Sequence, residues 1–294
     1  MRKSLVGALA AVLAVTATVA GCGETAYDDA ARGPVIGGTP PAKPYDGPLD
    51  VPVKEVSGDD EDDPRQIRDA SGAAGRALEC DGEAYGGGNS DPWSKGDGGS
   101  TPEEGLEVYF DIEQPDVPRS GYRVERTEGE RVLYSFDVKG ETKVAVVVAK
   151  DRPDRPGWGP ETSASCDPAE LPASYTDSRD YEIWTDAQGR RVPITRMTGY
   201  AGAEHCDWQS AHFLSLNDGR EEQTYVRDPE GVFSPEEFTT RYDGDVTLPR
   251  DARDTGFRLG ERALFRTPDT SRVYIRTPNG VELWPAPKRR LGCA

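Results

Sequence analysis

The chain has 294 residues with 53 acidic and 35 basic side chains, which gives a formal net charge of −18 at neutral pH. A surface this acidic is repelled by nucleic acid phosphates and gains nothing from anionic lipid headgroups, so we predict no nucleic-acid partner. The length allows one or two domains with hydrophobic cores, and the composition by itself assigns no activity.

The N-terminus has the pattern of a signal peptide. Two basic residues precede an apolar stretch over residues 5–19, which is short for a transmembrane span and ends in small residues. The sequence Val19-Ala20-Gly21-Cys22 resembles a bacterial lipobox, in which the peptide is cut before the cysteine and a lipid is built on its sulfur. We therefore predict a signal peptide over residues 1–21, lipidation of Cys22 and attachment to the extracytoplasmic face of the cell membrane, in preference to an uncleaved signal anchor.

Residues 22–70 are predicted to form a disordered tether. They are rich in Gly, Pro and Asp, and such a composition does not bury enough apolar surface to offset the entropy of an ordered chain. The acidic run from Asp59 to Asp63 lacks the alternating ligands and the turn glycine of a calcium-binding loop. We therefore interpret this run as part of a solvated spacer.

Beyond the tether, several short motifs occur twice in the same order, at offsets of 126 to 133 residues. The pairs are Cys80 and Cys206, Thr101–Glu104 and Ser234–Glu237, Gly129–Arg131 and Gly260–Arg262, and Cys166 and Cys293. We predict a diverged tandem duplication, with a first module over residues 71–180 and a second over residues 181–294.

Each predicted module combines a short helix with antiparallel β-hairpins. The residues that start at Thr101 and Ser234 form capping boxes, which predict helices over 102–112 and 235–242. Runs of β-branched and aromatic residues separated by turn signals then predict hairpins. These pair residues 131–138 with 142–149 around Lys139-Gly140, 262–267 with 272–277 followed by 281–284, and 181–185 with 191–195. The predicted fold class is α+β, with both modules closed by a disulfide.

Five cysteines are an odd number for a secreted protein. Setting Cys22 aside for lipidation leaves two cysteines in each module, in an oxidising compartment. Among the three possible connectivities, the duplication selects the bridges Cys80–Cys166 and Cys206–Cys293, each worth about 4–5 kcal/mol in the chain-entropy estimate. A zinc site and a redox site usually need C-x-x-C spacing, which the sequence lacks.

The two histidines, His205 and His212, flank Cys206-Asp207-Trp208 and are the strongest candidates for chemistry. One hypothesis is a metal site made by His205, Asp207 and His212, although seven residues separate the two histidines, too many for joint ligation without bending. The interpretation we favour is a disulfide packed by Trp208 with polar histidines at its edge. No nucleophile elbow, Ser-x-x-Lys pair or phosphate-binding glycine loop occurs, so we assign no catalytic residue and no cofactor.

The lipobox, the segment His205–Trp208 and the terminus from Val281 to Cys293 resemble hypothetical lipoproteins of actinobacteria, which are secreted proteins of unknown function. The resemblance implies an envelope location and no assigned reaction. We therefore expect a non-catalytic envelope lipoprotein that binds an unidentified partner, whether another envelope protein, a small molecule or a glycan. The alternatives are an extracytoplasmic hydrolase that uses carboxylates or a metal, and a solute-binding protein with its ligand between the modules.

Overall fold

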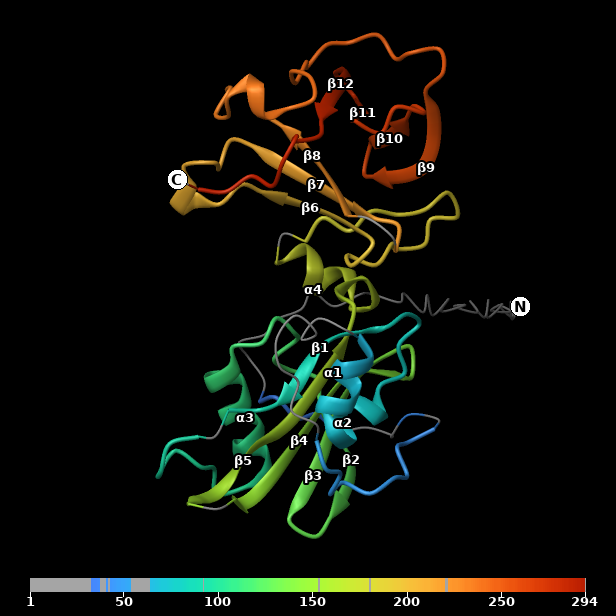
Figure 1. The fold of residues 1–294 in the computed structure, drawn as a ribbon. Helices are drawn as coiled ribbons and strands as arrows, with labels where there is room; N and C mark the ends of the chain where they lie inside the picture. The colour runs from blue at the N-terminus through green and yellow to red at the C-terminus, as the bar shows by residue number, and fades with distance from the viewer. Residues whose placement is uncertain are drawn as a thin grey trace, which may run out of the picture.

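The computed structural model describes residues 33–37, 41, 43–53, 64–91, 93–152, 154–179, 181–219 and 222–293. The predicted signal peptide, the lipidation site at Cys22 and the acidic run at 59–63 lie outside these residues. Within them, no helix has both the length and the apolar composition needed to cross a bilayer. The described chain folds into two halves that follow each other in sequence (Figure 1).

The first half is built on a five-stranded antiparallel sheet (Figure 1). Its strand order is β1 (Ala84–Asn89), β5 (Arg155–Cys166), β4 (Glu141–Arg152), β3 (Arg131–Val138) and β2 (Arg123–Glu128). The central strand β4 is buried on both faces from Val144 to Val148, because helices cover the two sides of the sheet. A strand in this position is a continuous apolar run rather than an alternating one.

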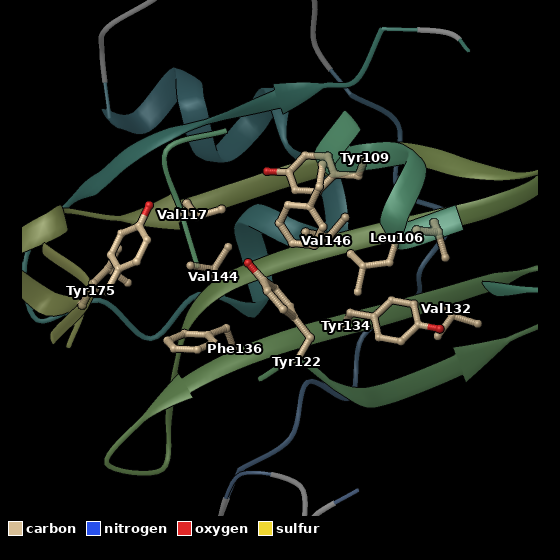
Figure 2. Close-up of a cluster of buried hydrophobic side chains, with 13 residues drawn as sticks. Leu106, Tyr109, Val117, Tyr122, Val132, Tyr134, Phe136, Val144, Val146 and Tyr175 are labelled. Atoms are coloured by element: carbon tan, nitrogen blue, oxygen red, sulfur yellow. The ribbon is translucent and has the colours of Figure 1, made fainter. Parts of the chain in front are cut away.

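Helices close the sheet on both faces. On one face, α3 (Pro102–Glu113) packs on the even-numbered residues of β3 and β4 and forms a core rich in aromatic side chains (Figure 2). On the other face, α1 (Pro64–Ala70) and α2 (Gly72–Ala77) pack on the odd-numbered residues. Thr101 caps α3, because its hydroxyl accepts a hydrogen bond from the backbone N–H of Glu104 at 3.2 Å. The predicted helix over 102–112 is therefore confirmed.

The prediction of a disordered tether across residues 22–70 is wrong for parts of that range. Leu49 is 2% exposed and lies in the core between the sheet and the two N-terminal helices. Val35 pairs with Tyr122 in a parallel β-bridge, and α1 itself begins before residue 70. A few apolar side chains in this segment pack on the sheet. The prediction missed them because it used the average composition of the whole segment, in which polar residues dominate.

The second half contains two antiparallel sheets that share a core. One has the order β6 (Met197–Ala201), β7 (His212–Asn217) and β8 (Glu222–Arg227), and the other has the order β12 (Gly280–Pro285), β11 (Arg272–Thr277), β10 (Arg262–Arg266) and β9 (Arg253–Leu259). Trp184 and Trp284 are buried in the shared core. The predicted hairpin of 262–267 with 272–277 is confirmed, whereas 181–185 and 191–195 are joined through one β-bridge between Thr185 and Arg191.

The helix predicted over 235–242 is wrong in length. Ser234 does form a capping box with Glu237, but a 3-10 turn of three residues follows in place of an α-helix. Phe238 then takes an extended conformation and packs edge-on against Phe233, with ring centroids 5.6 Å apart, in a buried aromatic cluster. Burial of a phenyl ring contributes about 1.5–3 kcal/mol, which exceeds what one more exposed helical turn would add.

The α+β class is confirmed at the level of antiparallel sheets with few helices and two disulfides. The last four strands of each half share one neighbour order, which is β5-β4-β3-β2 in the first half and β12-β11-β10-β9 in the second. The parts that precede these strands differ. The first half adds β1 to its single sheet and packs helices on it, whereas the second half builds a separate three-stranded sheet.

The cysteines pair as predicted. Cys80 bonds to Cys166 and Cys206 bonds to Cys293, with Cα atoms 5.4 and 5.5 Å apart. The bridged residues are 86 and 87 positions apart in the sequence, so each disulfide closes most of one half into a covalent loop. In the chain-entropy model a cross-link restricts the unfolded chain more as the loop grows, and loops of this length correspond to about 4–5 kcal/mol.

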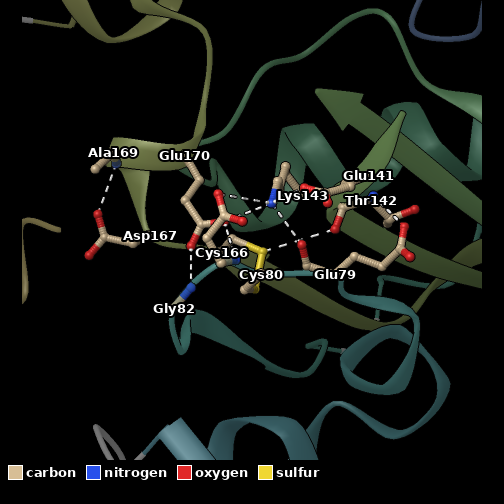
Figure 3. The surroundings of a disulfide bond; sticks show 11 residues. Glu79, Cys80, Gly82, Glu141, Thr142, Lys143, Cys166, Asp167, Ala169 and Glu170 are labelled. Carbon is tan, nitrogen blue, oxygen red and sulfur yellow. Dashed lines mark hydrogen bonds and ion pairs between the residues drawn. A yellow bond between two sulfur atoms is a disulfide. The ribbon is translucent and has the colours of Figure 1, made fainter. Parts of the chain in front are cut away.

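A buried lysine, Lys143, lies beside the first disulfide (Figure 3). The ammonium group of Lys143 contacts the carboxylates of Glu141 and Glu170 at 2.9 Å each. Glu170 also accepts hydrogen bonds from the backbone N–H groups of Asp81 and Gly82, at 2.7 and 3.0 Å. Burial alone would lower the pKa of Lys143, but its bonds to the two carboxylates outweigh burial and raise the pKa above its usual value. Lys143 therefore stays charged and fixes the chain that follows the first cysteine.

Candidate binding site between the two halves

A groove of about 790 Å³ lies where the two halves meet. The first half contributes Tyr85 at the start of β1 and Asp177. The second half contributes β6, the start of β7 and the turn between β9 and β10. The side chains that define its chemistry are Tyr85, Tyr181, Glu182, Tyr200, His212 and Arg262. Ligand sites concentrate at boundaries of this kind between folded units.

The carboxylate of Asp167 fixes the second half against the end of β5. Asp167 is 2% exposed and directly follows the disulfide-bonded Cys166. Its oxygens accept hydrogen bonds from the backbone N–H groups of Ala169, Ile194 and Thr195 at 2.8, 3.0 and 3.2 Å, and from the Thr195 hydroxyl at 3.1 Å. A buried carboxylate is stable only when donors replace the water it has lost, and here four donors do so.

Two further contacts hold the connecting segment in place. The guanidinium group of Arg191 donates to the backbone oxygen of Leu171, and to the hydroxyl of Thr176 at 2.6 Å. The phenol of Tyr181 donates to Asp116, which belongs to the loop after α3. Burial raises the pKa of Tyr181, and the hydrogen bond to Asp116 raises it further, so this phenol stays neutral and acts as a donor. These contacts hold Tyr181, which lines the groove, and the connecting segment in place.

A charged cluster of three side chains lies in the groove. The carboxylate of Glu182 accepts from Nε2 of His212 at 2.9 Å and from Nη2 of Arg262 at 2.8 Å, one bond to each oxygen. Because an ionised carboxylate only accepts, Nε2 of His212 carries the proton in this pair. The imidazole ring also packs edge-on against Trp284, with ring centroids 5.8 Å apart. The cluster thus joins a strand from each sheet of the second half.

Gly199 makes room for this cluster. Glu182 pairs with Gly199 on β6 in an antiparallel β-bridge. A Cβ atom at position 199 would overlap the Oε2 atom of Glu182 and would lie 3.1 Å from Nε2 of His212. The carboxylate therefore occupies the space that a side chain on β6 would take, and this is the route by which it reaches His212 on the next strand.

The charge of Glu182 is maintained by its two donors. Burial alone would raise the pKa of Glu182, but the hydrogen bonds from His212 and Arg262 outweigh burial and hold the pKa below its usual value. Both oxygens are engaged and the group is ionised at neutral pH. The cluster therefore presents a fixed set of polar groups rather than a carboxylic acid ready to donate a proton.

Two exposed tyrosines border the same groove. Tyr85 is 42% exposed and Tyr200 is 47% exposed, and both belong to the small set of large hydrophobic side chains that the described surface leaves open. Tyr200 stacks in parallel on Phe213, with ring centroids 5.3 Å apart and an interplanar angle of 6°. Its ring is therefore held in one orientation with its outer face accessible, which suits stacking against a flat or ring-shaped ligand.

The residues of the metal hypothesis lie in different places. His205 and Asp207 line a hollow beside the second disulfide together with Trp208, whereas His212 lines the groove and contacts Glu182. Within the described residues, the groups of three potential ligand atoms within 4.8 Å of one another all contain both sulfurs of a disulfide, and none unites His205, Asp207 and His212. Trp208 packs on Phe233 at a centroid distance of 4.7 Å.

Comparisons with protein-family models, curated proteins and solved structures found no match to this chain. No local motif marks the groove either, since Glu182 lies 30 residues from His212 and 80 residues from Arg262. The fold joins them because the segment around residues 182–185 pairs with β6 at Gly199 and with β9 at Arg258. Of the three residues in the cluster, the sequence analysis singled out only His212, because the chain has only two histidines.

Replacement of the buried carboxylate, Asp167→Ala, should lower the free energy of unfolding by about 2–4 kcal/mol, because it leaves buried N–H groups without their acceptor. Urea denaturation measures the loss. The control Asp186→Ala removes a carboxylate that also accepts backbone N–H groups, but in an exposed turn, and should cost less than about 1 kcal/mol. Equal losses in the two variants would contradict the role given to Asp167.

The Glu182 cluster should make stability depend on pH. Since the folded-state pKa of Glu182 is depressed, its contribution is present above the unfolded pKa of about 4.3 and is lost as the pH falls through the folded pKa. Glu182→Gln should be less stable than the parent by about 1 kcal/mol at pH 7, and this deficit should shrink as the pH falls through the folded-state pKa of Glu182. Denaturation over a series of pH values from neutral to acid, with the exposed Glu204→Gln as control, measures this. A deficit that grows toward acid pH is the contrary result.

Proposed function

We propose that this chain is a lipid-anchored protein of the cell envelope that binds a short saccharide in the groove without transforming it. The observation that carries the proposal is the presence of Tyr85 and Tyr200, one from each half, beside a cluster of polar groups. An aromatic face packs on the C–H face of a sugar ring, while a few convergent polar groups bond to its hydroxyls and fix its orientation.

The state of the charged cluster favours binding over catalysis. A general acid in saccharide hydrolysis needs a raised pKa, whereas the pKa of Glu182 is lowered. Both oxygens of this carboxylate are already bonded, to His212 and Arg262. The described residues that line the groove also include no serine or cysteine to act as a nucleophile.

A carboxylate-dependent hydrolase is the second candidate, because Asp177 lines the same groove as Glu182. Glycoside hydrolysis commonly uses two carboxyl groups on either side of the bond that is cleaved. In that case Glu182 would have to release one of its two donors when the substrate binds. A solute-binding role would use the same groove and the same tyrosines.

We also infer that the two halves are diverged copies of one module. The ordered recurrence of sequence motifs and the shared neighbour order of the last four strands support this inference. The strands that follow the first cysteine of each half, β1 and β7, occupy corresponding places in the sequence but pair differently. In the second half β7 has joined β6 and β8, and this rearranged sheet carries His212 and Tyr200.

The anchoring proposal rests on the lipobox and is tested at its cysteine. Cys22→Ser should abolish incorporation of labelled palmitate and move the protein from the membrane fraction to the soluble fraction, because the sulfur accepts the lipid. Fractionation and labelling in a bacterial host that processes lipoproteins measure both effects. Thr25→Ala, three residues further on, serves as the control and should stay labelled. A Cys22→Ser protein that still carries the label would refute the proposal.

Binding in the groove is tested with the mature, detergent-solubilised protein. Maltotriose, cellotriose, mannotriose and chitotriose serve as probes in calorimetric titrations. At least one should bind, and Tyr85→Ala and Tyr200→Ala should each weaken that binding about five- to tenfold, since each removes an aromatic face worth about 1 kcal/mol.

Ile112→Ala changes an exposed apolar residue of α3 outside the groove and should leave the affinity unchanged. If none of the four probes binds, or if all three variants weaken binding equally, the saccharide proposal is wrong. Chromatography of the probe after incubation separates the two candidate functions, because shortened saccharides would identify a hydrolase.

A further inference from the structure

A second hollow, of about 900 Å³, lies in the second half next to the groove, with which it shares Tyr200 and Ala201. Its walls are the three-stranded sheet of β6, β7 and β8 and the C-terminal segment over residues 286–291. Trp208, Phe213 and Tyr200 contribute aromatic surface, and Arg289 and Arg290 contribute positive charge. Apart from the two shared residues, the lining of the hollow has no part in the proposed role of the groove.

The two arginines are unusual in their surroundings. The whole chain has a net charge of −18, yet Lys288, Arg289 and Arg290 follow one another directly. Lys288 donates to the backbone oxygen of Glu236 at 3.1 Å, and Arg289 lies 3.9 Å from the carboxylate of Glu237 with its side chain 79% exposed. Among the described residues Arg290 forms no ion pair. The guanidinium groups are therefore largely available to an external anion.

One carboxylate also lines the hollow and affects its net charge. Glu222 at the start of β8 contributes to the wall and lowers the local positive charge. Among the side chains that line the hollow, two guanidinium groups against this one carboxylate leave a net positive charge, while Glu237 lies beside Arg289 without lining the hollow. Arginine also offers paired N–H donors in the geometry that a carboxylate or phosphate group accepts, so a small number of them is enough for recognition.

The segment that carries the arginines is held in a fixed position. Cys293 bonds it to Cys206, which precedes Trp208 by two residues. Backbone hydrogen bonds run from Ala286 to Ser271 at 2.8 Å and from Lys288 to Glu237 at 2.7 Å. The disulfide therefore ties the basic segment and the aromatic wall into one site, and little ordering remains for a ligand to impose.

We propose that this hollow binds an acidic saccharide, whose carboxylate or phosphate groups pair with Arg289 and Arg290 while a sugar ring packs on Trp208. The aromatic wall distinguishes this ligand from a simple inorganic anion, and the arginines distinguish it from the neutral saccharide of the groove. The acidic surface of the rest of the molecule disfavours an extended anionic membrane as the occupant, because the bilayer would face that surface as well.

The probe is trigalacturonic acid, titrated into the mature, detergent-solubilised protein, with maltotriose as the uncharged comparison. Trigalacturonate should bind more tightly than maltotriose at this site, and its affinity should fall as salt is added. The double variant Arg289→Ala/Arg290→Ala should lose at least tenfold in affinity. The matched control Arg250→Ala/Arg253→Ala removes the same charge from two exposed arginines elsewhere and should lose less than twofold.

Other variants separate this proposal from the groove. Tyr85→Ala should leave trigalacturonate binding unchanged, because Tyr85 does not line the second hollow. The double arginine variant should leave any neutral trisaccharide bound in the groove unaffected. An unchanged melting temperature shows that each variant is folded. The proposal is overturned if trigalacturonate does not bind, if both arginine pairs lose affinity equally, or if phosphatidylglycerol vesicles displace trigalacturonate from the parent protein.

Discussion

The buried carboxylate of Asp167 is the contact on which the arrangement of the two halves depends. It sits at the point where the first half ends, directly after the disulfide at the end of β5, and its bonds to Ile194 and Thr195 reach into the second half. The free energy of burying a charge is unfavourable by several kcal/mol unless donors compensate it. These bonds hold the backbone of residues 194 and 195 in place, and β6 begins two residues further on.

The turn that contains Asp167 also makes contacts with an earlier part of the chain. Glu170, three residues after Asp167, accepts from Lys143 and from the backbone that follows the first cysteine. One acidic residue thus holds the beginning of the first half to its end, and the other holds the second half to that end. The segments held at these two attachments carry Tyr85 and Ile194, and both of these residues line the groove. In an acidic protein, much of the internal order comes from where acidic groups find donors.

Local signals in the sequence were sufficient to predict part of this fold. The capping box at Thr101, the turn at Lys139-Gly140 and the paired cysteines each specify structure through residues close together or through a duplicated order. The same capping box at Ser234 did not extend into a helix, because the burial of Phe238 outweighed helix propagation. Leu49 was missed for a related reason, since one well-placed apolar residue decides where a segment packs while its polar neighbours dominate the composition.

The candidate site was less accessible from the sequence. His212 stood out as one of two histidines, but its partner Glu182 is one of many acidic residues, and nothing nearby distinguishes it. Gly199 leaves space for the carboxylate of Glu182 because it has no side chain. This role becomes visible only when the structure places β6 next to that carboxylate. Both facts depend on pairing between segments far apart in sequence, which periodicity and spacing do not encode.

The packing of the N-terminal segment on the first sheet limits how far the molecule can stand from a membrane. If Cys22 carries the lipid, eleven residues lead from it to Gly33, the first residue that the structure describes. A fully extended chain spans at most about 3.5 Å per residue, so the segment from Cys22 to Gly33 is no longer than about 40 Å. A tether free up to residue 70 would have reached several times farther. Gly33, where the described part of the chain begins, would thus stay within about 40 Å of the lipid on Cys22.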